Sequence, residues 1–104
     1  MSDWFVYMIR CRDASLYTGI TTDVPRRFAE HQENGNTGAK YLRGRGPLTL
    51  VFQKSIGSRS IALSVERKVK KLPKTKKEEL LLDDTFIERI ILETGDRITY
   101  DSEP

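Results

Sequence analysis

Cysteine is nearly absent from the sequence: Cys11 is the one cysteine among 104 residues. A single cysteine excludes an internal disulfide and any zinc site built from several cysteines. We therefore expect the protein to occupy a reducing compartment. We expect Cys11 itself to be a small buried residue at the end of a strand and not a nucleophile.

Long apolar runs are also missing. No stretch approaches the roughly 18 apolar residues that a membrane-spanning helix requires, so we expect no membrane partner. Residues 1–13 place an acid ahead of a short apolar segment, with no basic region and no small-residue cleavage site, and do not resemble a secretory signal. A cytoplasmic location is the expectation, and 104 residues suit one domain with a modest core.

Basic residues are concentrated in the middle of the chain, although the net charge is only +3. Residues 26–77 hold fourteen basic and three acidic side chains, whereas residues 78–104 hold two basic and nine acidic ones. The basic block is expected to create a positive surface field that favours a polyanionic partner, and nucleic acid is the obvious candidate. The alternative is a solvated basic face without a partner. The acidic end is either a solubilising cap or a screen near the binding surface.

The positions of apolar and turn residues predict a small α+β fold in which helices cover at least one face of a sheet. Two short apolar runs on either side of Asp13 predict a β-hairpin, and Pro25 lies where the first turn of a helix is expected. Ser58 or Ser60 is expected to cap a long helix that stops before Pro73. In chain order we also expect strands over about 4–9, 16–20 and 48–52, helices over about 24–33, 75–82 and 85–92, one helical turn over 39–43, and a polar tail from 94 to 104.

Two tyrosines meet in the expected hairpin. If the hairpin is centred near Asp13, Tyr7 faces Gly19 and Ile9 faces Tyr17. The tyrosines then lie on one face of the sheet as diagonal neighbours, roughly 7–8 Å apart. Gly19 carries no side chain and leaves an open patch between them, so both hydroxyls are within reach of one small ligand.

The helix expected over 24–33 has an unusual inward stripe. Residues three and four apart share one face of a helix, and here they are Val24, Arg27, Phe28 and His31. Arg27 and His31 would therefore point toward the hairpin tyrosines, and polar groups on a buried stripe need partners. The structural alternative is that Arg27 pairs with a nearby acid and His31 lies at the helix end.

Glu66 is the only acid of residues 34–77 and shares a helical row with Ala62 and Val69. Its sequence neighbours are basic, so one interpretation is an intrahelical ion pair. The other is a magnesium ligand, because Mg²⁺ needs few carboxylates and takes further oxygens from water and substrate phosphates.

Together these residues resemble the GIY-YIG endonuclease domain. The likeness is carried by an ordered series: Val6-Tyr7, then Tyr17-Thr18-Gly19, Arg27, His31 one helical turn on, and Glu66 on a later helix. It covers about residues 4–82 and is greatest for the small, single-domain bacterial branch of YhbQ-like proteins. We expect residues 1–84 to form the nuclease-like domain, and the C-terminal helix and acidic polar tail over 85–104 to belong to the same unit.

The resemblance implies a three-stranded antiparallel sheet flanked by helices, and hydrolysis of phosphodiester bonds with one divalent metal, Mg²⁺ or Mn²⁺. It makes Tyr17 the general base or the residue that orients it, and Tyr7 its companion. It makes Arg27 the phosphate-stabilising arginine and Glu66 the metal ligand. His31 matches a histidine found in some members.

We therefore expect a magnesium-dependent endonuclease that acts on DNA with low sequence specificity or a preference for DNA structure. Sequence-independent phosphate contacts are expected from Lys40, Arg43, Arg45 and the lysines of 68–77, among them Lys68, Lys70 and Lys71. Tyr41 is either a base-stacking residue or a packing residue. The alternatives are a nucleic-acid-binding module that keeps the fold without catalysis, and a protein-interaction adaptor. RNA as a substrate, a protein partner that supplies targeting, and the oligomeric state stay open.

Overall fold

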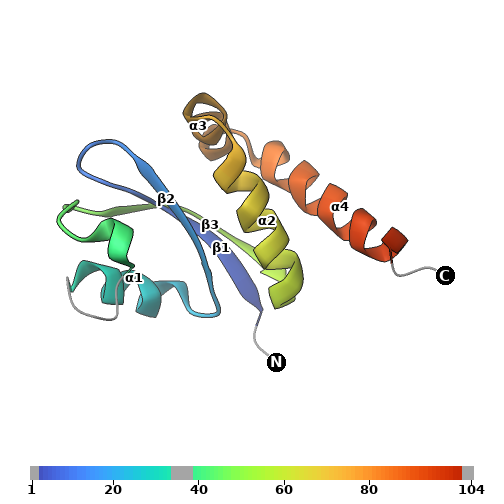
Figure 1. Ribbon diagram of the computed structural model, residues 1–104, viewed down its shortest axis with the longest axis horizontal. Coiled ribbons are helices and arrows are strands. Elements are labelled where there is room, and N and C mark those ends of the chain that lie inside the picture. Colours follow the sequence, from blue (N-terminus) through green and yellow to red (C-terminus); the bar gives the residue numbers. More distant parts are fainter. Residues whose placement is uncertain (1–2, 34–38, 102–104) are drawn as a thin grey trace.

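The computed structural model describes residues 3–33 and 39–101, in which three strands form one antiparallel sheet in the order β2-β1-β3 (Figure 1). The elements are β1 Trp4–Arg10, β2 Leu16–Thr21, α1 Val24–Gln32, the short 3₁₀ helix η1 Lys40–Leu42, β3 Thr49–Gly57, α2 Arg59–Lys71, α3 Lys74–Leu82 and α4 Asp84–Asp101. The expected fold class, a three-stranded antiparallel sheet flanked by helices, is confirmed.

The β1-β2 hairpin has the register that its sequence predicts. Tyr7 pairs with Gly19, and Ile9 pairs with Tyr17. Because side chains alternate between the faces of a strand, this register places both tyrosines on the same face of the sheet.

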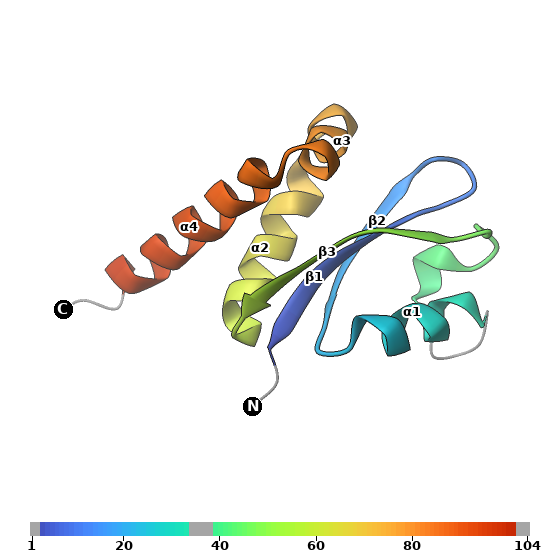
Figure 2. The same ribbon diagram turned by 180° about the vertical axis from the view of Figure 1, so that it is seen from behind.

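Helices cover both faces of the sheet, so the central strand β1 is buried on either side (Figure 1, Figure 2). On one face the strands pack against α2, α3 and α4 in the larger core, formed by Val6, Met8, Leu16, Val65, Val69, Leu80, Ile87 and Ile90. On the other face a smaller cluster contains Tyr7, Ile9, Cys11, Val24 and Leu42, beside α1 and η1. We call the first the core face and the second the site face. Cys11 is buried next to the end of β1, as expected.

Side chains cap the N-termini of α1 and α2, which flank the sheet on opposite faces. Asp23 precedes α1 and accepts a hydrogen bond from the backbone N–H of Arg26 at 3.2 Å, with Pro25 in the first turn. Ser58 precedes α2 and accepts a hydrogen bond from the backbone N–H of Ile61 at 3.3 Å. Such caps satisfy backbone donors that have no partner inside the helix, and they confirm where these helices begin.

The third strand is longer than its sequence predicts. It was expected over 48–52 but runs over Thr49–Gly57, where Gly57 pairs with Trp4 at the far end of β1. The polar residues Gln53 and Ser55 hid the continuation, because pairing along the whole of β1 outweighs their weak strand propensity.

The expectation of a polar tail from residue 94 is wrong over most of its length, because α4 continues to Asp101. Thr94, where the tail was expected to begin, is buried, and its hydroxyl donates to the Ile90 carbonyl at 2.8 Å. This hydrogen bond satisfies the hydroxyl within the helix, so α4 accommodates the polar residue Thr94 in its interior. Neither α4 nor any other helix of the described ranges is long and apolar enough to span a bilayer.

Candidate active site

Tyr7 lies directly over Gly19 on the site face. A Cβ atom at position 19 would lie 2.6 Å from the Tyr7 hydroxyl oxygen and 2.7 Å from Cζ, so only glycine leaves room for the phenol ring. The patch at Gly19 was expected to be open. It is instead filled by Tyr7, which is 1% exposed. The rings of Tyr7 and Tyr17 have centroids 6.3 Å apart and are inclined by 50°, so the hairpin brings the two tyrosines together.

His31, on the last turn of α1, is 2% exposed and uses both ring nitrogens. Nδ1 accepts a hydrogen bond from the Ala39 backbone N–H at 3.1 Å, and Nε2 lies 2.8 Å from the Tyr7 hydroxyl oxygen. Burial, together with the nearby Arg27, lowers the pKa of His31 to about 4, so the ring is neutral at pH 7. A neutral ring has one N–H, and because Nδ1 accepts, Nε2–H must donate to Tyr7.

Arg27 lies beside the Tyr7 hydroxyl and also pairs with Glu30, with 2.8 Å between Nη1 and Oε1. Both interpretations of this arginine therefore hold in part, since it has an acidic partner and it faces the tyrosine. Burial, and then Tyr17, raise the pKa of the Tyr7 phenol, while the Arg27 guanidinium acts in the opposite direction. Tyr7 is consequently protonated at neutral pH.

Tyr17 is partly buried and is stacked from its outer side. The ring of Tyr41, on η1, lies parallel within 28° at a centroid distance of 5.9 Å. The Arg45 guanidinium lies 4.3 Å from the Tyr41 ring centre, and its Nη1 is 2.8 Å from a carboxylate oxygen of Asp13 in the hairpin turn. The Tyr41 ring therefore has a packing role against Tyr17, and Arg45 already has a carboxylate partner.

Glu66 lies on α2, which packs against the core face and not the site face. Its side chain is 14% exposed, and one carboxylate oxygen is 3.3 Å from the Lys70 Nζ. Lys70 lines a hollow that also contains Tyr17 and Tyr41, so the Glu66–Lys70 row of α2 is turned toward the outer edge of β2. The intrahelical ion pair is thus present.

The donor set at Glu66 suits some metals and not others. Over residues 3–33 and 39–94, no three His, Cys, Asp or Glu side chains gather in a cluster that could hold a metal ion. That part of the chain therefore contains no site in which several protein side chains could coordinate zinc. One carboxylate fits Mg²⁺ or Mn²⁺, which keep several water ligands and take others from a substrate phosphate.

A family model described as the GIY-YIG catalytic domain matches residues 3–79 of this chain. The chain belongs to the GIY-YIG family. Among curated relatives, a UPF0213 protein from Cronobacter sakazakii is 56% identical over 88 residues, which cover 85% of this chain and 90% of the relative. The UPF0213 protein YhbQ from Escherichia coli K12 is 54% identical over 83 residues, which cover 80% of this chain and 81% of the relative.

Two solved structures share the fold of this GIY-YIG chain. The solution NMR structure of the UPF0213 protein BH0048 from Bacillus halodurans is 46% identical, with a TM-score of 0.50 over 76% of this chain and 82% of that one. The solution NMR structure of the protein EF2693 from E. faecalis is 35% identical, with a TM-score of 0.56 over 83% of this chain and 88% of that one.

The basic residues of this GIY-YIG chain that were expected to bind nucleic acid differ in exposure. Lys40 and Arg43 are exposed at η1, and Lys70 and Lys71 are exposed on α2. Lys68 is not presented in the same way, because its Nζ is enclosed and has no hydrogen-bond partner among the described residues. Residues two apart on a helix face different directions, which explains why Lys68 is enclosed and Lys70 is exposed. Binding by these residues stays a prediction.

Two contacts of the GIY-YIG site were missed in the sequence. The Ala39 backbone N–H fixes the His31 tautomer, and Asp13 holds Arg45 over Tyr41. A backbone donor leaves no signal in the sequence. Asp13 was assigned only to the hairpin turn, because its second role depends on a residue 32 positions away.

Proposed function

We propose that the protein is a metal-dependent endonuclease that hydrolyses phosphodiester bonds in DNA, with low sequence specificity or a preference for DNA structure. The observation that carries the proposal is the Tyr7 hydroxyl fixed by the Nε2–H of a neutral His31, beside Tyr17 and Arg27. Membership of a family defined by a catalytic domain supports a nuclease and a nucleic-acid substrate.

Arg27 has the chemistry needed at the attacked phosphate. Hydrolysis makes the phosphoryl oxygens more negative, and positive charge fixed beside them stabilises the transition state. A guanidinium stays protonated and offers planar N–H donors that match phosphate oxygens. The 2.8 Å pair with Glu30 restrains the Arg27 side chain before substrate arrives.

We assign the attacking water to Tyr17, because its side chain is only partly buried whereas Tyr7 is enclosed. Tyr7 accepts from His31 and keeps its own proton, so it is a fixed donor beside Tyr17. Tyr17 then removes the proton of the water or orients that water for attack, as the resemblance implies.

Glu66 is the residue that would hold Mg²⁺ or Mn²⁺. Bound there, the ion would neutralise charge on the scissile phosphate and on the leaving oxygen. The chain itself supplies the carboxylate on a helix, and the Lys70 ammonium at 3.3 Å is the partner that a bound cation would replace.

Low sequence specificity follows from the kind of side chains that surround the site. Lys40, Arg43, Lys70 and Lys71 are exposed cations, and cations that contact phosphates position a duplex without reading its bases. We therefore expect cleavage governed by charge and by DNA shape.

Plasmid nicking tests the proposal. Purified protein is incubated with supercoiled DNA and Mg²⁺, or Mn²⁺, and nicked circles are measured on agarose gels. We expect Glu66→Gln and Tyr17→Phe to lose about 100-fold or more of the nicking rate while still binding DNA. Glu79→Gln is the matched control, because Glu79 is an exposed carboxylate on α3 that pairs with Lys76 at 3.2 Å.

The other outcomes separate the alternatives. Salt-sensitive DNA binding without nicking under either metal contradicts the enzyme and supports a non-catalytic nucleic-acid-binding module. No salt-sensitive affinity for DNA at all supports a protein-interaction adaptor. Preferential cleavage of RNA would keep the chemistry and change the substrate.

A further inference from the structure

A hollow of about 350 Å³ lies at the outer edge of the sheet, beside the candidate active site. Residues of β2, η1, α2 and α3 line it: Leu16, Tyr17, Thr18, Tyr41, Lys70 and Lys77. We call it the edge hollow. Because β2 is an outer strand, no further strand covers the hollow, and Tyr17 belongs both to it and to the site face.

Two side chains that line the edge hollow have no hydrogen-bond or ion-pair partner among the described residues. Thr18 is 3% exposed, and its Oγ1 atom has no hydrogen-bond partner among the described residues. Buried hydroxyls are nearly always hydrogen-bonded, so Thr18 has an unused donor in the wall of the hollow, which a rotation of its side chain would turn toward a ligand. Lys77 is half-buried and takes part in none of the ion pairs of the described residues.

The charge of the edge hollow favours an anion. It has two ammonium groups, from Lys70 and Lys77, and no carboxylate of the described residues lines it; Glu66 pairs with Lys70 at 3.3 Å, and Glu78, next to Lys77, pairs with Arg10 and Lys74. A metal ion on Glu66 would free Lys70 as well. Ammonium groups and a hydroxyl are all donors to phosphate oxygens, and Lys acts as a point charge for phosphate.

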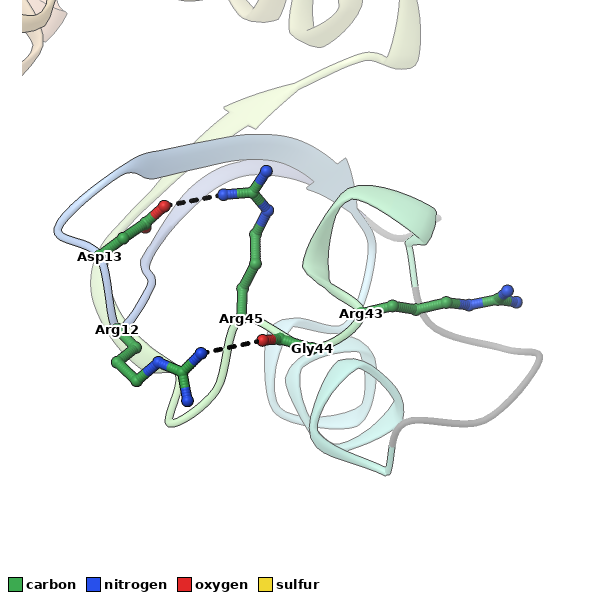
Figure 3. Close-up of a pocket in the computed structure, with 5 residues that line it drawn as sticks. All are labelled: Arg12, Asp13, Arg43, Gly44 and Arg45. Atoms are coloured by element: carbon green, nitrogen blue, oxygen red, sulfur yellow. Dashed lines mark hydrogen bonds and ion pairs between the residues drawn. The ribbon is translucent and has the colours of Figure 1, made fainter.

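A second polar hollow of about 300 Å³, near the hairpin turn, makes a useful contrast (Figure 3). It has three arginines but also the Asp13 carboxylate, and Arg45 already pairs with that carboxylate at 2.8 Å. Arg12 points to the Gly44 carbonyl, and the Arg43 side chain extends away from the other two arginines. Its donors are satisfied or turned outward, whereas those of the edge hollow are not.

We propose that the edge hollow binds one phosphate group of a nucleic-acid strand, adjacent to the phosphate that is attacked at Tyr17. This adds Thr18 and places Lys77 and Lys70 on one phosphate, with Lys70 as the cation shared with Glu66. The identity of the strand rests on the proposed function. The phosphate group itself is either an internal phosphodiester or the terminal phosphate of a strand end.

Binding measured without metal tests the edge hollow independently of hydrolysis. The affinity of a fluorescent DNA oligonucleotide is titrated in EDTA at several salt concentrations for wild type, Lys77→Gln, Thr18→Val and Lys76→Gln. Lys76 is the matched comparison within the same basic segment, because it adjoins Lys77 but is exposed, pairs with Glu79 and does not line the hollow. We expect Lys77→Gln to weaken binding severalfold and to reduce the slope of log K against log salt by about 0.9, the value for one lost phosphate contact to duplex DNA.

Thr18→Val keeps the shape of the side chain and removes only the hydroxyl, so it is expected to weaken binding two- to fivefold in a normally folded protein. Equal effects of Lys77→Gln and Lys76→Gln, with no effect of Thr18→Val, would overturn the proposal. If wild type shows these binding changes on substitution but does not nick DNA, the endonuclease proposal fails and the edge hollow stands. If wild type nicks DNA and the variants bind normally, the edge hollow fails and the endonuclease stands.

Amide chemical shifts identify the source of the phosphate. Inorganic phosphate is titrated into the ¹⁵N-labelled protein, and saturable shifts are expected at Thr18 and Lys77. An oligonucleotide whose binding depends on Lys77 only when it carries a 5′-phosphate indicates a terminal phosphate, and equal dependence indicates an internal one. Shifts confined to the hollow of Arg12, Arg43 and Arg45 would contradict the assignment.

Discussion

The core face and the site face are built from alternate residues of the same strand, yet they differ in kind. Val6 and Met8 of β1 point into an apolar core with α2, α3 and α4. Tyr7, one residue on, enters a face where a buried hydroxyl and a buried imidazole are bonded to each other. Because side chains alternate between the two faces of β1, residues that stabilise the fold and residues of the candidate site lie on opposite faces. Substitutions on the core face should therefore lower stability, and substitutions on the site face should lower activity.

The largest expected effect is on the core face. Leu80, on α3, is fully buried, and Leu80→Ala should lower the free energy of unfolding by about 2–5 kcal/mol, because it removes apolar burial and leaves a cavity. Urea denaturation measures the change. Leu82, on the same helix, is 90% exposed, so Leu82→Ala should change stability by less than about 0.5 kcal/mol. Equal losses from both variants would contradict the placement of α3.

On the site face, Gly19→Ala should destabilise the protein less than Leu80→Ala does but should reduce its nicking activity more. The added Cβ would lie 2.6 Å from the Tyr7 hydroxyl oxygen, so the phenol must leave its position over the strand. We expect the free energy of unfolding to fall by about 1–3 kcal/mol. The nicking rate should fall further than the smaller fraction of folded protein accounts for. Gly46→Ala is the control, because its Cβ would meet nothing closer than 3.9 Å. Full nicking activity of Gly19→Ala would contradict the assignment of the chemistry to the site face.

The buried histidine should give the site face a pH dependence that the core face lacks. The pKa of His31 is about 4 in the folded protein against an ordinary 6.5, so the unfolded chain binds the proton more readily. Stability from this group is complete above pH 6.5 and is lost as the pH falls toward 4, by about 1.5 kcal/mol between pH 6.5 and 5. Denaturation curves at each pH should show this decrease in wild type and a flatter profile in His31→Gln. Parallel profiles would mean that His31 is not held neutral.

The smallest effect is expected at Tyr41. Tyr41→Ala removes the ring that stacks on Tyr17 and lies under Arg45, so Tyr17 is less restrained. An aromatic pair contributes about 0.5–1.5 kcal/mol, and we expect nicking to fall up to about tenfold with little change in global stability. Tyr41→Phe keeps both stacking faces and should restore the rate. Failure of Phe to restore it would assign the role to the hydroxyl and not to the stack.

Much of the framework follows from local sequence patterns. The hairpin register, the caps of α1 and α2 and the shared face of Tyr7 and Tyr17 depend on near neighbours and on the two-residue period of strands. The extent of β3 does not, because pairing with β1 extends it through polar residues, and neither does that of α4, which continues to Asp101 where a polar tail was expected. The roles of Tyr7, Tyr17, Arg27, His31 and Glu66 stay predictions that the nicking experiment addresses.

By itself the sequence determined which elements form, which strand face carries the tyrosines, and which family the residue series resembles. These properties depend on spacing along the chain. Only the tertiary structure decided that Tyr7 fills the space over Gly19, that His31 is the Nε2–H tautomer, that Tyr41 covers Tyr17, and that Thr18 and Lys77 share one hollow. Each of these contacts joins side chains or backbone groups from different elements, and their distances are set by packing, which spacing along the chain does not encode.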